Sequence, residues 1–216
     1  LEKTKQEFTT QRGDTVTLSK AHVMELYLLN KRPQAQGHLL RGGIVQPEIG
    51  RIRRGTETIF LTEEDLANIT GTLTSEEKKI ADGMQQLTLL LAEWGNKASM
   101  AVYGYEKFKD PNYWTIKSAP EGVEQTVEKG QQKARSIANM GSAKSVVPEA
   151  SNTLDISGIF NTFDQHAADM LTYAAWLAPM EDTNRLFNFK FRDADGNLTG
   201  KNMKALLNRY GGEGST

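Results

Sequence analysis

Hydrophobic residues recur at spacings of three and four along two long stretches of the chain, which is the pattern of an amphipathic helix. The first stretch begins at Thr74 or Ser75, either of which can cap a helix, and it predicts a helix from Thr74 to Tyr103. The residues expected on its buried face are Ile80, Met84, Leu87, Leu90, Leu91 and Trp94.

The second long stretch predicts a helix from Asp155 to Ala178, capped by Asp155 or Ser157. Pro179 is expected to bend the chain, and the helix should continue from Met180 to Asn188. Its expected buried stripe consists of Ile159, Phe160, Phe163, His166, Ala167, Met170, Leu171, Ala174 and Leu177. Because each long helix has an apolar stripe to bury, we expect the two to pack against each other. The predicted fold class is therefore mainly α, with smaller helices and a few short strands around this pair.

Shorter elements are expected on both sides of the long helices. Caps and breakers predict short helices after Ser19, from Pro33 to the paired glycines Gly42 and Gly43, after Thr62, and from Asn202 to Tyr210. Apolar or alternating runs predict strands at Thr15–Leu18, Thr58–Leu61 and Tyr113–Lys117, and a hairpin or turn at Phe187–Asn202. The polar stretch Ala119–Glu149 is expected to be a long excursion that is helical near Glu128–Met140.

This pattern divides the chain into an N-terminal helical and basic segment, residues 1–72, and a helical core domain, residues 73–216. The two parts also fit one continuous domain. The sequence begins without an initiator methionine, and we expect it to be a piece of a longer polypeptide.

Composition narrows the function classes. With 38% hydrophobic residues and a mean hydropathy of -0.53, the 216-residue chain is expected to be folded but elongated, with a thin core. A net charge of -1 argues against electrostatic binding of nucleic acid or anionic membrane by the whole chain. The absence of cysteine excludes disulfides and thiolate chemistry. No apolar run reaches the ~18 residues that a membrane-spanning helix needs.

One segment is locally basic. Positions 31 to 54 contain six basic residues and a single acidic residue, Glu48. The planar guanidinium group of arginine can form two parallel hydrogen bonds with phosphate oxygens, so this segment is a candidate for phosphate contact. The alternative is a solvated loop whose arginines pair with Glu57, Glu63 or Glu64. The candidate nucleic-acid-binding residues are Lys31, Arg32, Arg41, Arg51, Arg53 and Arg54.

Asp193, Asp195 and Asn197 have a spacing that suggests a metal site. Together with Thr199 they fit the first ligands of a calcium-binding loop, but the glycine stands at the fourth position and Lys204 at the last, where an acid is needed. The same run resembles the DxDGD metal motif of two-barrel RNA polymerases, with Asn197 in place of the third acid. A plain turn supported by its own Asp and Asn side chains is the simpler interpretation.

Other candidate chemistry is sparse. His22, His38 and His166 fall on three different predicted helices without ligand partners nearby in sequence, which favours structural roles. There is no phosphate-binding loop, dinucleotide fingerprint, zinc-protease motif or hydrolase serine motif. The aromatic residues between Trp94 and Trp114 suggest a surface on which single-stranded bases could stack. The simpler alternative is that they pack in the hydrophobic core between the first long helix and the segment that follows it.

Several segments resemble a known family. Leu18–Ile44, LSKAHVMELYLLNKRPQAQGHLLRGGI, resembles a helix followed by paired glycines in the large polyvalent proteins of tailed phages and prophages. The matching residues are Met24, Leu26, Tyr27, Asn30, Lys31, Arg32, Gln34, Ala35, His38, Gly42 and Gly43. The resemblance continues in order through Leu61–Ile69, Leu73–Gln85, Trp94–Ile116, Asp155–Phe189 and Met203–Gly214. It departs at Lys97, where an acid is expected, and at Trp114–Thr115, in place of an aromatic–proline pair.

The resemblance implies a helical connecting region of a large virion-associated protein that carries enzymatic modules elsewhere. The favoured hypothesis is therefore a non-catalytic structural or interaction domain, located in the virion or the host cytoplasm. Its expected partners are neighbouring modules of the same polypeptide, phage DNA or other virion proteins. The alternatives are a nucleic-acid-binding module that uses the basic segment, and part of a metal-dependent polymerase or nuclease that uses Asp193 and Asp195 with Glu181 and Asp182. No cofactor is predicted.

Overall fold

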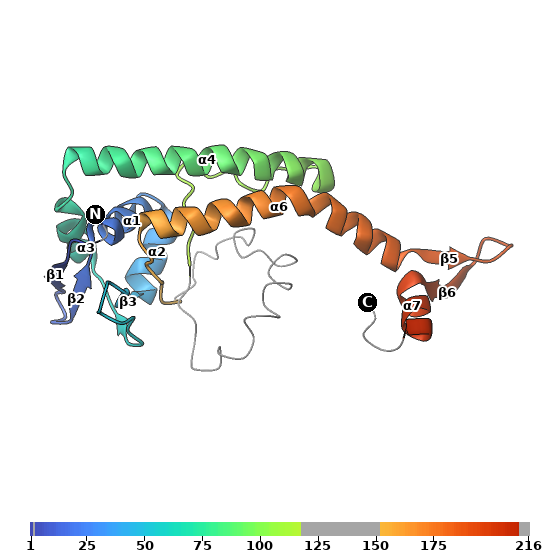
Figure 1. Ribbon diagram of the computed structural model, residues 1–216, viewed down its shortest axis with the longest axis horizontal. Coiled ribbons are helices and arrows are strands. Elements are labelled where there is room, and N and C mark those ends of the chain that lie inside the picture. The colour runs from blue at the N-terminus through green and yellow to red at the C-terminus, as the bar shows by residue number, and fades with distance from the viewer. Residues whose placement is uncertain (2, 118–151, 212–216) are drawn as a thin grey trace.

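The computed structural model describes residues 1, 3–117 and 152–211. Its elements form an elongated molecule with a head at one end, two long helices side by side, and a small tip at the other end (Figure 1). The fold is mainly α, and its two long helices pack together as the sequence predicted. The expected helix near Glu128–Met140 lies outside the described residues.

The head contains the main hydrophobic core. Its elements are β1 (Gln6–Thr9), β2 (Thr15–Leu18), α1 (Lys20–Asn30), α2 (Pro33–Gly42), β3 (Ile44–Val45), β4 (Thr58–Ile59) and α3 (Glu63–Gly71). The strands form two antiparallel pairs, β1 with β2 and β3 with β4. Helix α1 is the centre of the head, because it is buried nearly all round rather than along one stripe. Trp114, Leu154 and Ile156 complete this core from later in the chain.

Local signals set where the helices of the head begin. Ser19 accepts a hydrogen bond from the backbone N–H of His22, and the His22 ring accepts one from the Ser19 N–H, 3.1 Å away. Thr62 and Asp65 form the same reciprocal cap for α3. These caps satisfy backbone N–H groups that the first helical turn leaves without partners.

The two long helices are α4 (Ser75–Tyr103) and α6 (Ile159–Asn188). Thr74 caps α4 with Glu77, as the sequence predicted. The helices run in the same direction, because Ser99 lies against Tyr173 and Tyr103, further along α4, against Glu181. Gly158 precedes α6 as its cap residue, so the expected capping by Asp155 or Ser157 is wrong.

The face of α4 that meets α6 is not the predicted one. The buried residues of α4 are Ala81, Gln85, Thr88, Ala92, Gly95 and Ser99, which are mostly small. Of the predicted stripe, Ile80, Leu87, Leu90 and Trp94 are instead exposed. Small side chains let two helix backbones approach closely, and this close contact decides which face of α4 turns inward.

A connector, residues 104–117, returns from the end of α4 toward the head. Phe108 and Tyr113 pack on Tyr173 and Met170 of α6 in a second hydrophobic cluster, and Trp114 reaches the main core. The predicted strand at Tyr113–Lys117 is wrong, since this segment pairs with no strand among the described residues. Its side chains fill gaps between elements, which accounts for its apolar sequence.

The tip is formed where α6 extends beyond the end of α4 (Figure 1). The helix continues through Pro179, as predicted. It leads to the antiparallel strands β5 (Lys190–Arg192) and β6 (Leu198–Asn202) and to α7 (Met203–Gly211). The hairpin and the last helix therefore follow the sequence prediction.

Gly95 gives a test of the close helix contact. A Cβ atom at this position would lie 2.5 Å from Met170 Sδ and 2.8 Å from Phe108 Cε2. We expect Gly95→Val to lower the free energy of unfolding by about 1–3 kcal/mol, the usual cost of overpacking a core. Urea denaturation followed by circular dichroism measures this change.

Gly83 on the same helix is the matched control, because a Cβ there meets no atom within 4 Å. The same change, Gly83→Val, should leave stability within about 0.5 kcal/mol of the wild type or raise it. Equal losses at the two glycines would contradict the close packing of α4 on α6.

Candidate functional site

The six basic candidate residues between positions 31 and 54 have different surroundings. Lys31 Nζ lies 2.6 Å from Asp82 Oδ1 of α4. Arg32 is buried; its Nε donates to Asp110 Oδ2 at 2.6 Å, and a second nitrogen donates to the Trp114 carbonyl at 2.9 Å. The structure thus uses Lys31 and Arg32 to tie the head to α4 and to the connector.

The remaining basic residues lie further along the segment. Arg54 pairs with Asp155 at 3.3 Å, just before α6. Arg41, at the end of α2, and Arg51 and Arg53, in the loop between β3 and β4, are exposed. The ion-pair partners of Lys31, Arg32 and Arg54 come from distant parts of the chain and not from the Glu57, Glu63 and Glu64 proposed as nearby alternatives.

These contacts lead to a prediction for nucleic-acid binding. We expect the chain to give no gel shift with duplex DNA or single-stranded RNA at low salt, since three of the six cations already have carboxylate partners. A complex whose affinity falls with salt at a log–log slope near about -2.7, the value for three phosphate contacts, would contradict this expectation. If such a complex forms, changing Arg51, Arg53 and Arg54 together to alanine should remove most of that slope.

The Asp193–Asn197 segment is the turn of the β5–β6 hairpin. Asp193 Oδ1 accepts hydrogen bonds from the backbone N–H groups of Asp195 at 3.0 Å and Asn197 at 2.8 Å. Its carboxylate is therefore occupied in supporting the turn. No group of three or more acidic or histidine side chains suited to a metal ion occurs among the described residues.

The aromatic candidates divide between two environments. Phe108, Tyr113 and Trp114 are buried in the two hydrophobic clusters, where they seal the joint between the helices and the head. Trp94 and Tyr105 are more than half exposed, at 54% and 53%. The aromatics therefore do not form one stacking surface.

A buried polar cluster, which sequence reasoning did not find, joins α1 to the start of α6. Glu25 is 2% exposed. Its carboxylate accepts hydrogen bonds from the Gly158 N–H at 2.6 Å and from the Thr162 hydroxyl at 2.7 Å. Gly158 has no side chain to cap α6, so the Glu25 carboxylate does this from another helix and faces the positive end of the α6 dipole.

Burial controls the ionisation of this region. It raises the pKa of Glu25 to about 7, although the bonds from Thr162 and Gly158 and the charge of Lys117 act in the opposite direction. Burial also lowers the pKa of both His22 and His166 to about 4. Both ring nitrogens of His166 lack a hydrogen-bond partner among the described residues. The only obvious signal for Glu25 in the sequence is a lone acid among apolar residues in the first helix.

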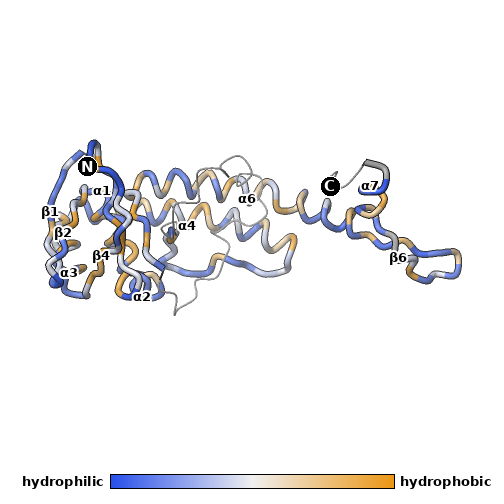
Figure 2. The backbone as a smooth tube through the Cα atoms, turned by 90° about the horizontal axis from the view of Figure 1, so that it is seen from below, coloured by the Kyte–Doolittle hydropathy of each residue, from blue (hydrophilic) through white to orange (hydrophobic). Residues whose placement is uncertain are grey.

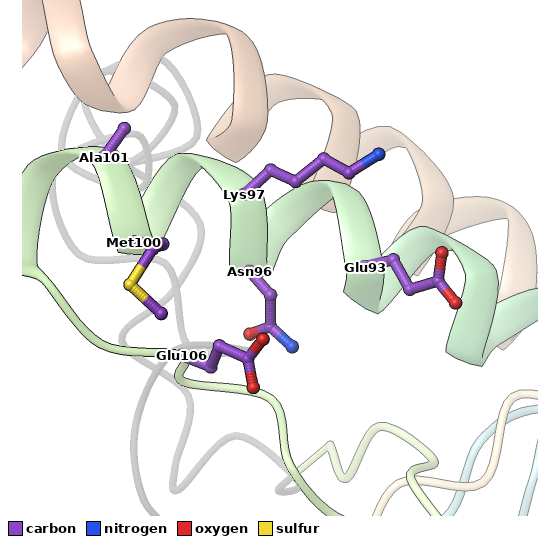
Figure 3. A pocket seen from close by; sticks show the side chains of 6 residues that line it. All are labelled: Glu93, Asn96, Lys97, Met100, Ala101 and Glu106. Atoms are coloured by element: carbon purple, nitrogen blue, oxygen red, sulfur yellow. The ribbon is translucent and has the colours of Figure 1, made fainter.

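A shallow hollow of about 560 Å³ lies beside the C-terminal half of α4 (Figure 3). Its lining residues are Glu93, Asn96, Lys97, Met100, Ala101 and Glu106. The Asn96 amide faces the connector, where its oxygen accepts from the Phe108 N–H at 2.8 Å and its nitrogen donates to the Phe108 carbonyl at 2.8 Å. The Asn96 hydrogen bonds therefore fix the connector beside this hollow.

An exposed apolar stripe runs along α4. We define the α4 face as Glu76, Lys79, Ile80, Gly83, Leu87, Leu90, Glu93, Trp94 and Lys97, all of which are exposed. Ile80, Leu87, Leu90 and Trp94 are 44%, 46%, 55% and 54% exposed. Figure 2 shows hydrophobic positions recurring between hydrophilic ones along both long helices. On α4 the larger of these side chains point away from α6.

Comparison of the chain with protein-family models, curated proteins and solved structures gave no significant match. In the described part of the chain, no helix is both long and apolar enough to span a bilayer.

Proposed function

We propose that this chain is a non-catalytic structural or interaction domain of a large multidomain phage or prophage protein, and that the α4 face is its docking surface. The α4 face carries the proposal: four large apolar side chains stand exposed at helical spacing while small residues occupy the buried side. Contiguous apolar surface of this kind marks interaction sites in soluble proteins. The resemblance to large polyvalent phage proteins supports the assignment to a parent protein.

The distribution of acids and bases supports a non-catalytic role. Burial changes the pKa of Glu25, His22 and His166 strongly, and all three side chains are buried, the first two on α1 and the third on α6. Glu25 and His22 have structural hydrogen bonds at the starts of α6 and α1. Their altered ionisation is therefore explained by burial at helix ends.

The long helices support a spacing role. At a rise of 1.5 Å per residue, the 29 residues of α4 extend about 43 Å. The other long helix, α6, has 30 residues and runs past the end of α4, so it connects the head to the tip (Figure 1). A rigid helix pair of this kind holds two neighbouring modules apart while leaving one helix face free to dock.

Lysine cross-linking followed by mass spectrometry tests the proposal in particles or cells that contain the parent protein. Lys79 and Lys97 belong to the α4 face, whereas Lys3 and Lys5 are exposed near the N-terminus, outside this face, and serve as controls. We expect Lys79 and Lys97 to cross-link to a specific partner surface more often than the two controls. Equal or lower frequencies would contradict a docking role for the α4 face.

A further inference from the structure

The apolar residues of the α4 face repeat with the period of a coiled coil. Ile80, Leu87 and Trp94 are seven residues apart, and Gly83 and Leu90 lie between them at the alternate spacing of three and four. This is the a/d pattern of a helix whose seam packs against a second helix. The partner α6 occupies the opposite side of α4, so this seam is available to another molecule.

We infer that the partner of the α4 face is the α4 face of a second copy of this chain, packed antiparallel about a two-fold axis near Leu87. This inference rests on the proposed docking role of the same face. In this arrangement Ile80, seven residues before the axis, lies opposite Trp94 of the second copy, seven residues after it. Leu87 meets its own equivalent, as the centre of a two-fold contact requires.

Shape supports this register. Gly83 lies opposite Leu90 of the second copy, because the two are nearly equal distances from Leu87 along the helix. A Cβ on Gly83 would meet no atom within 4 Å, so there is open space at this position. Leu90 is 55% exposed and has a side chain of the size to enter that space. Pairing a large residue with a small one lets facing helices interdigitate.

Charge selects the antiparallel orientation. The α4 face begins with Glu76 and Lys79 and ends with Glu93 and Lys97. In the antiparallel pair, Lys79 of each copy lies beside Glu93 of the other, and Glu76 beside Lys97. A parallel pair would instead place Glu76 beside Glu76 and Lys97 beside Lys97 of the second copy, because both are d positions of the seam, and such like-charge contacts disfavour that arrangement. Two-fold symmetry gives each attractive contact twice.

The test is sedimentation equilibrium of the full 216-residue chain from about 1 μM to about 1 mM, the range in which a contact of modest area is expected to associate. We expect a monomer–dimer equilibrium. Leu87→Glu, which places two carboxylates together at the axis, should weaken the dimer at least about 100-fold. Asp164→Lys, an exposed change on α6, is the control and should have no effect.

A charge reversal distinguishes the antiparallel contact from a parallel pair and from a dimer formed through a different surface. Lys79→Glu alone and Glu93→Lys alone should each weaken the dimer by about tenfold, and the double reversal should restore it to within about threefold. Lys79 and Glu93 are about 21 Å apart along one helix, so they can compensate each other only between copies. Circular dichroism should show an unchanged fold, because both residues are exposed.

A chain that stays monomeric at every concentration, or a double reversal no better than the single ones, would overturn the second copy as partner. The proposed docking role fails separately, through the cross-linking of Lys79 and Lys97. Cross-links from these lysines to a different protein, together with a monomeric chain, would keep the docking role and reject self-association.

Discussion

Replacing Arg32 with alanine should lower the free energy of unfolding by about 3 kcal/mol, the lower end of the usual loss when one partner of a buried ion pair is removed, because Asp110 is only partly buried. The Arg32 side chain is 11% exposed and that of Asp110 is 22% exposed. The change leaves the Asp110 carboxylate without its cation and the Trp114 carbonyl without its donor. Urea denaturation of the wild type and the variant measures the loss.

Two further variants make this prediction specific. Arg32→Lys should lose about half as much, because an ammonium group can reach Asp110 but does not form the planar fork that also reaches Trp114. Arg51→Ala, an exposed arginine of the same basic segment, should change stability by less than about 0.5 kcal/mol. If Arg32→Ala and Arg51→Ala have the same small effect, Arg32 is not the link between head and connector.

The helix boundaries follow from local chemistry and were therefore predictable. Thr74 and Glu77 form a capping box within four residues, so the start of α4 is readable without knowledge of the rest of the fold. The end of α4 is equally local, since Gly104 adopts a left-handed conformation there, with φ of 76°. The hairpin turn at Asp193–Asn197 also depends only on nearby residues.

The orientation of α4 depends on distant residues and was predicted wrongly. The spacing of the large apolar residues predicted that Leu87 and Trp94 would be buried, whereas Ala92 and Gly95 are buried instead. The deciding factor is the shape of α6, where Met170 lies against Gly95 and Tyr173 lies against Ser99. Nothing in the sequence of α4 by itself shows which side its neighbour occupies.

The ion pairs and the buried polar cluster around Glu25 could not be predicted from the sequence, because their partners also lie far apart in the chain. Arg32 pairs with a residue 78 positions away, and Glu25 with one 137 positions away. The sequence indicated that the basic segment was unusual, but only the fold shows that Arg32 is buried within it. A run of charge in the sequence therefore says little about which of its members lie on the surface.

Replacing Glu25 with glutamine should raise the free energy of unfolding at pH 8 by up to about 3 kcal/mol and leave it nearly unchanged at pH 4. Burial raises the pKa of Glu25 to about 7 in the folded chain, above its ordinary value of 4.5. The folded state thus holds this proton more tightly than the unfolded state. Protonated Glu25 therefore contributes to the stability of the wild type fully below about pH 4.5, and this contribution is lost as the pH rises to about 7.

The buried histidines act in the opposite direction. Their pKa values fall to about 4 on folding, so the stability that neutral His22 and His166 provide is present above about pH 6.5 and lost as the pH falls toward 4. The wild-type profile therefore combines opposing trends. The difference between Glu25→Gln and the wild type removes the histidine contributions, because both proteins contain the same histidines.

Glutamine resembles the protonated carboxyl group, since its amide can accept from the Gly158 N–H while donating to Thr162. Urea denaturation at intervals between about pH 4 and about pH 8 gives the difference curve. The exposed Glu48→Gln is the matched control and should give a difference within about 0.5 kcal/mol throughout. A Glu25→Gln variant that becomes less stable than the wild type as the pH rises would show that the ionised carboxylate stabilises the start of α6. It would contradict the prediction that burial has a larger effect on the pKa of Glu25 than its hydrogen bonds do.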